Sequence, residues 1–211
     1  MKTDDLIAFL AQDAGPAQGP AAEQVGGRLA IGMVTAFLMV LYLGLNPSLR
    51  AFAATSPFTV KMVWLFVLLV FSAILVYRLI HPGRRMGGAP WGIGFALLAM
   101  AGLGLIQLLQ APPEQRTALW MGATWRVCAI NIAFIALPML AALLWTLRDM
   151  APTQRTLAGA MSGVLAGALA AMLYSLHCPE NSFAFYALWY SGGMGLSALV
   201  GAALSAWFLR W

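Results

Sequence analysis

Hydrophobic residues are arranged along the chain in long continuous stretches, and neither strand-like alternation nor a one-sided helical stripe is seen. Six such stretches follow one another, separated by short segments that carry most of the prolines and charges. Each is about 20 residues long, which, as a helix rising about 1.5 Å per residue, crosses the hydrocarbon core of a bilayer. The pattern therefore predicts an all-α, polytopic integral membrane protein with six transmembrane helices, at residues 28–45, 60–79, 91–109, 127–147, 156–176 and 185–209.

The amino-acid composition is also typical of an integral membrane protein. Hydrophobic residues make up 62% of the 211 residues and charged residues only 9%, too few to cover a water-soluble surface. The mean hydropathy is +0.82. Acidic residues near the start occupy the place of the basic region of a signal peptide, so no cleaved signal is expected. The net charge of +5 does not predict nucleic-acid binding, because the basic residues lie at span ends, where they set topology.

The distribution of lysine and arginine predicts that both termini are cytoplasmic. In that orientation eight basic residues lie inside and four outside. The inner set is Lys2, Arg28, Arg78, Arg84, Arg85, Arg148, Arg155 and Arg210, and the outer set is Arg50, Lys61, Arg116 and Arg126. With Lys61 counted outside, the span interiors hold no ionisable side chain, which disfavours an ion-coupled transporter.

The first 27 residues precede the spans and form a separate unit, residues 1–27 against a membrane domain of residues 28–211. The segment is predicted to begin with a short amphipathic helix, too short to be stable alone. Thr3 is its predicted N-cap, and Asp4 and Asp5 lie in the first turn. The apolar face is formed by Leu6, Phe9 and Leu10, with Ile7 beside them. A Gly/Pro/Ala/Gln linker follows over residues 14–27. Such a segment either folds against a partner or lies on the membrane surface.

Small residues recur every fourth position in the last two predicted spans. Gly159, Gly163 and Gly167 in one are matched by Gly193, Ser197, Gly201 and Ser205 in the other. This spacing lets helix backbones approach closely, so we expect a packing seam between the two spans.

The most chemically varied turn is residues 174–182, which contains His177, Cys178 and Glu180. A thiol, an imidazole and a carboxylate this close can bind a soft metal or tune the reactivity of the thiol. The same stretch also fits a polar turn between two apolar helices, in which the cysteine acts as a small hydrophobic residue. The position of the other cysteine, Cys128, bears on the choice.

Helix geometry predicts that the two cysteines lie at the same depth. The fourth and fifth spans are joined by a short loop near residues 148–155, so they should be antiparallel neighbours. Cys128 lies about 30 Å from the loop and Cys178 about 34 Å, at about 1.5 Å per residue. On the outer face the pair can form a disulfide, act as a thiol sensor or bind a soft ion such as Cu(I), with His177 as an additional ligand. The absence of a Cys-x-x-Cys motif argues against a thiol–disulfide oxidoreductase, but a membrane thiol or electron-transfer protein that uses the pair is the alternative function.

The chain resembles the NrsF-type six-helix membrane anti-sigma factors, negative regulators of extracytoplasmic-function (ECF) sigma factors. The residues that carry the resemblance are the starting segment 1–7, the helix of Cys128, the His177-Cys178-Pro179-Glu180 turn and the closing residues 209–211. His81-Pro82-Gly83 departs from the Arg-Pro-Gly expected after the second span.

The resemblance implies a non-enzymatic regulator in a bacterial inner membrane. Its cytoplasmic N-terminal segment would hold an ECF sigma factor, and its outer cysteines would sense metal or oxidative stress and trigger release. No obligatory cofactor is implied. The metal-site hypothesis comprises Cys128, Cys178 and His177, with Cu(I) or another soft ion bound transiently.

Overall fold

The computed structural model describes residues 3, 22–81, 84–150 and 152–208. The expected partner-binding residues Asp4, Asp5, Leu6, Ile7, Phe9 and Leu10 lie outside the described residues. Thr3 is described and is exposed to solvent.

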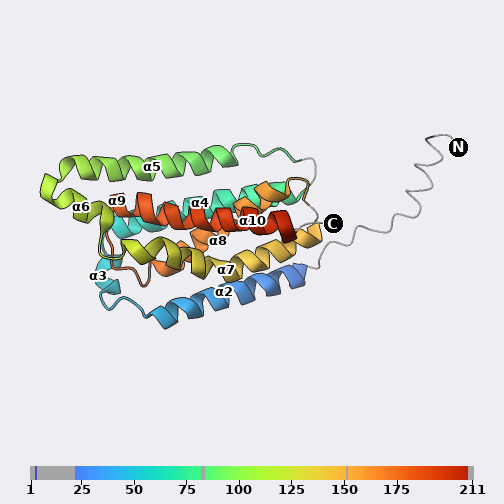
Figure 1. Ribbon diagram of the computed structural model, residues 1–211, viewed down its shortest axis with the longest axis horizontal. Coiled ribbons are helices and arrows are strands. Elements are labelled where there is room, and N and C mark those ends of the chain that lie inside the picture. The colour runs from blue at the N-terminus through green and yellow to red at the C-terminus, as the bar shows by residue number, and fades with distance from the viewer. Residues whose placement is uncertain (1–2, 4–21, 82–83, 151, 209–211) are drawn as a thin grey trace.

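The described residues form six helical segments that are long and apolar enough to cross a membrane (Figure 1). All six predicted spans are therefore confirmed as helices. Four are single α-helices. The fourth in chain order, Pro113–Met150, joins the short helix α6 (Pro113–Met121) to α7, and the last, Phe183–Phe208, runs through a short helix, a π-helical turn and a longer helix. Their bounds are α2 Ala22–Leu43, α4 Ser56–Ile80, α5 Ala89–Gln110, α7 Trp125–Met150, α8 Arg155–Tyr174, α9 Phe183–Phe185, η1 Tyr186–Tyr190 and α10 Ser191–Phe208.

Helix α2 begins at Ala22, earlier than the apolar stretch that starts near Arg28. The linker expected up to Gly27 is therefore helical in its last part. Hydropathy marks the part of a helix that contacts lipid, whereas backbone hydrogen bonding continues beyond it. Glu23 in the first turn also stabilises this start, because a negative charge there opposes the helix dipole.

Helix α8 is the most buried of the six described spans, and α10, α4 and α7 all pack against it. Helix α2 packs on α7 and helix α5 packs on α4, so α2 and α5 lie at opposite edges of the bundle (Figure 1). This arrangement places α7, which carries Cys128, in the interior of the bundle, and Cys178 lies in the loop that follows α8.

The glycine seam between α8 and α10 is confirmed. A Cβ atom on Gly163 would overlap the backbone of Ser197, and one on Gly201 would overlap the carbonyl of Gly159. Glycine is needed at these positions because the two backbones touch directly.

The two ends of the bundle differ. One end carries the short helices α3 (Leu49–Ala53) and α6 (Pro113–Met121) together with the loop from α8 to α9 (Figure 1). Because both cysteines lie there, we call it the thiol end. At the opposite end the first turns of α2 meet the last turn of α7.

Candidate functional site

The loop of residues 175–182 crosses the thiol end and is held there by several segments. The Nδ1 atom of His177 lies 2.7 Å from the backbone oxygen of Gly44, just after α2. The side-chain oxygen of Gln107, near the end of α5, accepts a hydrogen bond from the Ser182 hydroxyl at 3.0 Å. The loop is therefore tied to both edges of the bundle, and a change within it reaches α2 and α5 directly.

Glu180 fixes the same loop to the start of α7. One carboxylate oxygen accepts hydrogen bonds from the backbone N–H groups of Ala123 at 2.6 Å and Thr124 at 3.0 Å. The Thr124 hydroxyl donates to the same oxygen at 3.2 Å. Because α7 begins at Trp125, this carboxylate sits at a helix N-terminus, where the dipole favours negative charge. Gly122 permits the approach: its φ is +61°, and a Cβ there would crowd the Glu180 carboxylate.

The structure brings the two cysteines together, as the helix geometry predicts. Cys128 is 0% exposed and Cys178 is 3% exposed, and both are free thiols. Their side chains lie within hydrogen-bonding reach of each other. The hydroxyl of Thr124 lies 3.8 Å from the Cys178 sulfur. Two adjacent buried thiols of this kind can form a bond to one another or share one soft metal ion.

The surroundings of Cys178 favour its ionised form. Its pKa is lowered to about 6, chiefly because Cys128 hydrogen-bonds to its sulfur. The backbone N–H of Glu180 also contributes, and together these effects outweigh the opposing effect of burial. A thiolate is the nucleophilic and metal-binding form of cysteine.

The third member of the hypothetical metal site, His177, is engaged elsewhere through one ring nitrogen. Besides the contact of its Nδ1 with Gly44, its ring packs 5.5 Å from that of Tyr174. Within the described ranges no group of three or more His, Cys, Asp or Glu side chains is placed to hold a metal ion. The residues present therefore fit a soft ion that two sulfurs suffice to bind, and not a three-ligand site.

Lys61 is the functional candidate that sequence reasoning missed. It was expected on the outer aqueous side, but α4 begins at Ser56, so Lys61 lies inside the helix and is 0% exposed. Its ammonium finds no hydrogen-bond acceptor among the residues that the structure describes. The expectation that Lys61 lies in outer water is therefore wrong, because its side chain is enclosed by the bundle. Pro57 was the sequence signal that could have placed the helix start before Lys61, because proline is favoured in the first turn of a helix.

Aromatic rings surround the Lys61 ammonium. Its Nζ lies 4.8 Å from the ring centre of Phe58, 4.6 Å from that of Tyr186 and 5.5 Å from that of Tyr190. The two tyrosines begin and end the π-helical turn η1, and their rings are 5.3 Å apart. The Tyr186 hydroxyl donates a hydrogen bond to the backbone oxygen of Glu180 at 2.6 Å, which ties this cage to the cysteine loop. We call Lys61, Cys128 and Cys178 the thiol site.

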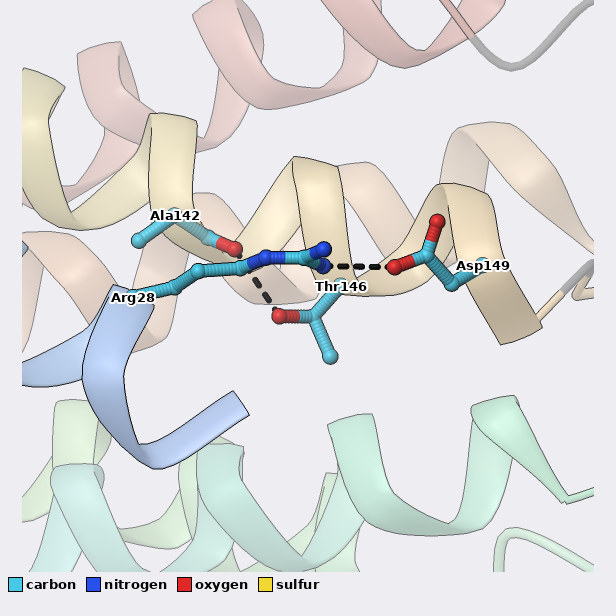
Figure 2. Close-up of polar contacts among 4 residues, drawn as sticks. All are labelled: Arg28, Ala142, Thr146 and Asp149. Atoms are coloured by element: carbon cyan, nitrogen blue, oxygen red, sulfur yellow. Dashed lines mark hydrogen bonds and ion pairs between the residues drawn. The ribbon is translucent and has the colours of Figure 1, made fainter. Parts of the chain in front are cut away.

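At the opposite end, an ion pair joins α2 to α7. The Arg28 guanidinium donates to the Asp149 carboxylate at 2.5 Å (Figure 2). The guanidinium also lies 5.6 Å from the ring centre of Trp145, one helical turn back on α7. Helix α7 thus carries Cys128 at one end and the partner of Arg28 at the other.

Comparison with known proteins gives a full-length match. A family model described as "Negative regulator of sigma F" matches residues 10–211. The chain is 39% identical over 214 residues to the probable anti-sigma-F factor NrsF of Azospira oryzae. It is 41% identical over 218 residues to the anti-sigma-F factor NrsF of Caulobacter vibrioides, and both alignments cover 100% of each chain. No solved structure matches.

Proposed function

The chain belongs to the family of negative regulators of sigma F, and from this membership we propose that it is an anti-sigma factor of the bacterial inner membrane that restrains an ECF sigma factor. The observation that carries the proposal is the similarity, over the whole length, to two proteins named as anti-sigma-F factors. Such proteins regulate by binding, so no catalytic activity is assigned.

The sigma factor is held by the N-terminal segment, residues 1–27, through the apolar face of Leu6, Phe9 and Leu10. Asp4 and Asp5 meet basic groups of the partner. The sequence pattern supports this assignment, because a marginal amphipathic helix on a tether gains stability by folding against another protein.

The membrane orientation has both termini in the cytoplasm and the thiol end outside. Its support is the distribution of arginine over the described part of the bundle. Three arginines lie toward the thiol end, Arg50, Arg116 and Arg126, whereas six lie toward the other end, Arg28, Arg78, Arg84, Arg85, Arg148 and Arg155. The buried Lys61 no longer counts toward the outer side. Basic residues accumulate on the cytoplasmic side of membrane proteins.

Release of the sigma factor is triggered at Cys128 and Cys178. The support is their adjacency and burial, together with the lowered pKa of Cys178, which suit a soft metal ion or an oxidant. Either event joins the start of α7 to the end of α8, and a ligand that prefers the joined arrangement shifts the protein toward it by its differential affinity.

The test is to co-express the full chain with its ECF sigma factor and follow where the sigma factor fractionates. The proposal expects it in the membrane fraction in resting cells and in the soluble fraction after Cu(I) or oxidant treatment. A sigma factor that stays soluble with and without the chain contradicts the anti-sigma assignment. It would favour the alternative of a membrane thiol or electron-transfer protein.

A further inference from the structure

We propose that Lys61 is a charge-selecting residue of the thiol site, whose caged ammonium neutralises the negative charge that two thiolates keep when they bind one soft monovalent metal ion. The inference rests on the proposed sensing by Cys128 and Cys178 and specifies the charge of the ion that they take.

The first support is that Lys61 is buried without a polar partner. Buried charges are normally paired, because removing an ammonium from water costs far more than burying an apolar group. Here the Nζ atom is fully covered and has no hydrogen-bond acceptor among the described residues. Three ring faces attract the cation, but they carry no net charge to balance it. The cage therefore holds a positive charge in place without neutralising it.

The second support is what the ammonium faces. The tyrosine rings that hold it, Tyr186 and Tyr190, pack in the same buried cluster as both cysteines. The Tyr186 hydroxyl also donates to the backbone oxygen of Glu180, two residues from Cys178. The Glu180 carboxylate is already bound by Ala123 and Thr124 at the N-terminus of α7. Lys61 and Glu180, both described, form no ion pair within 4.0 Å. The negative charge left for Lys61 to balance is the one that develops on the sulfurs.

The net charge of the metal–dithiolate complex distinguishes monovalent from divalent soft ions. Two cysteine thiols that bind a metal give up both of their protons, and the resulting pair of thiolates carries two negative charges. A monovalent soft ion such as Cu(I) leaves the complex with one negative charge, which the Lys61 ammonium neutralises. A divalent soft ion such as Hg(II) leaves a neutral complex beside an ammonium that stays unbalanced. Lys61 therefore favours monovalent over divalent soft ions at this site.

Lys61 is too deeply buried to bind an anion from solution. Its side chain is 0% exposed, and both sulfurs are covered nearly as fully. The groups that face the ammonium are the rings of Phe58, Tyr186 and Tyr190, so the balancing charge has to come from within the buried site.

The experiment measures binding of Cu(I) and Hg(II) separately to the full-length protein in detergent, each against a competing chelator. Lys61→Met removes the charge and keeps an apolar stem of similar length, and Lys61→Arg keeps the charge. Arg126→Met removes an exposed cation from the same end and is the matched control. We expect Lys61→Met to weaken Cu(I) binding by about tenfold or more without weakening Hg(II) binding, because a charge interaction in a partly dry site is strong. Lys61→Arg and Arg126→Met should keep the wild-type ratio of the two affinities.

Equal losses of Cu(I) and Hg(II) binding in Lys61→Met would overturn the proposal, because a purely structural role of Lys61 affects both metals alike. An unchanged ratio would overturn it as well. If Lys61→Met gives no folded protein, Lys61→Gln carries the same comparison with a neutral polar side chain. Cys128→Ser tests the cysteine pair separately from Lys61. Wild-type metal binding by that variant would contradict sensing by the cysteine pair, whatever the result for Lys61.

Discussion

Cys128 and Asp149 lie near opposite ends of one helix, α7, about 30 Å apart at about 1.5 Å per residue. The first adjoins Cys178, and the second binds Arg28 of α2, directly after the N-terminal segment. Between them, Pro138 interrupts the hydrogen-bond ladder of α7, and α2 packs there through Gly32, where a Cβ would lie 3.1 Å from the Pro138 oxygen. A change in how α7 meets the cysteine loop therefore reaches the base of the N-terminal segment through one continuous helix.

This connection predicts that the Arg28–Asp149 ion pair sets the threshold of release. The pair is about two-thirds covered, with exposures of 27% and 32%, so its free energy is small, about 1 kcal/mol or less. Asp149→Asn should lower the Cu(I) concentration for half-maximal release of the sigma factor by up to about fivefold. Exchanging the charges, with Arg28→Asp and Asp149→Arg together, should restore it.

Arg148→Met is the control for that experiment. Arg148 lies beside Asp149 on α7, but its guanidinium lies over the ring of Phe208, at 5.1 Å from the ring centre, and not on α2. The same shift in threshold for Arg148→Met and Asp149→Asn would mean that general charge at this end matters and the specific pair does not.

A second prediction concerns the partner surface. Leu6→Asp places a charge on the apolar face of the helix predicted near the N-terminus, so it should release the sigma factor even without a signal. If Leu6 is a buried anchor, the loss is about 2 kcal/mol or more, which is roughly 30-fold in affinity. Gln18→Ala in the linker should leave binding unchanged. Co-purification of the sigma factor with each full-length variant measures this, and equal recovery with Leu6→Asp and wild type would rule the surface out.

A third prediction concerns the pair of sulfurs. Cys128→Ser and Cys178→Ser should give the same loss of the stress response, and the double variant no larger one, because a two-sulfur site fails when either member is lost. His177→Ala should give a weaker defect, since its Nδ1 contact with Gly44 holds the loop in place. A reporter gene driven by the sigma factor provides the measurement. Additive losses, or a normal response in the double variant, would leave both cysteines as packing residues.

A fourth prediction tests the seam between α8 and α10. Gly163→Ala should lower the melting temperature in detergent strongly, because the new Cβ meets the Ser197 backbone, which cannot move aside. Gly195→Ala is the matched control: it is also a glycine inside a helix, but a Cβ there meets nothing within 4 Å. It should leave the melting temperature unchanged or raise it slightly, because alanine favours the helix more than glycine does. Equal destabilisation by both variants would contradict the seam.

The sequence by itself determined the six helices, their order and the meeting of the two cysteines. Long apolar stretches have few alternatives to helix in lipid, since every backbone polar group has to be satisfied within the segment. The fixed rise per residue then places Cys128 and Cys178 at one depth once α7 and α8 are taken as neighbours. The spacing of Gly159, Gly163 and Gly167 likewise predicted the seam, because residues four apart share a helix face.

Only the tertiary structure decided what surrounds those sulfurs. Hydropathy assigned Lys61 to the outer water because it averages over neighbours along the chain, whereas burial depends on which helices pack alongside. The rings that enclose Lys61 come from α4 and from the π-helical turn η1, two segments far apart in sequence. The single helix that connects Cys128 to Asp149 was visible in the sequence, but the contact of Asp149 with Arg28 was not. Which charges face one another across a bundle is set by how the helices are rotated and packed, and a one-dimensional pattern of apolar stretches carries too little of that information.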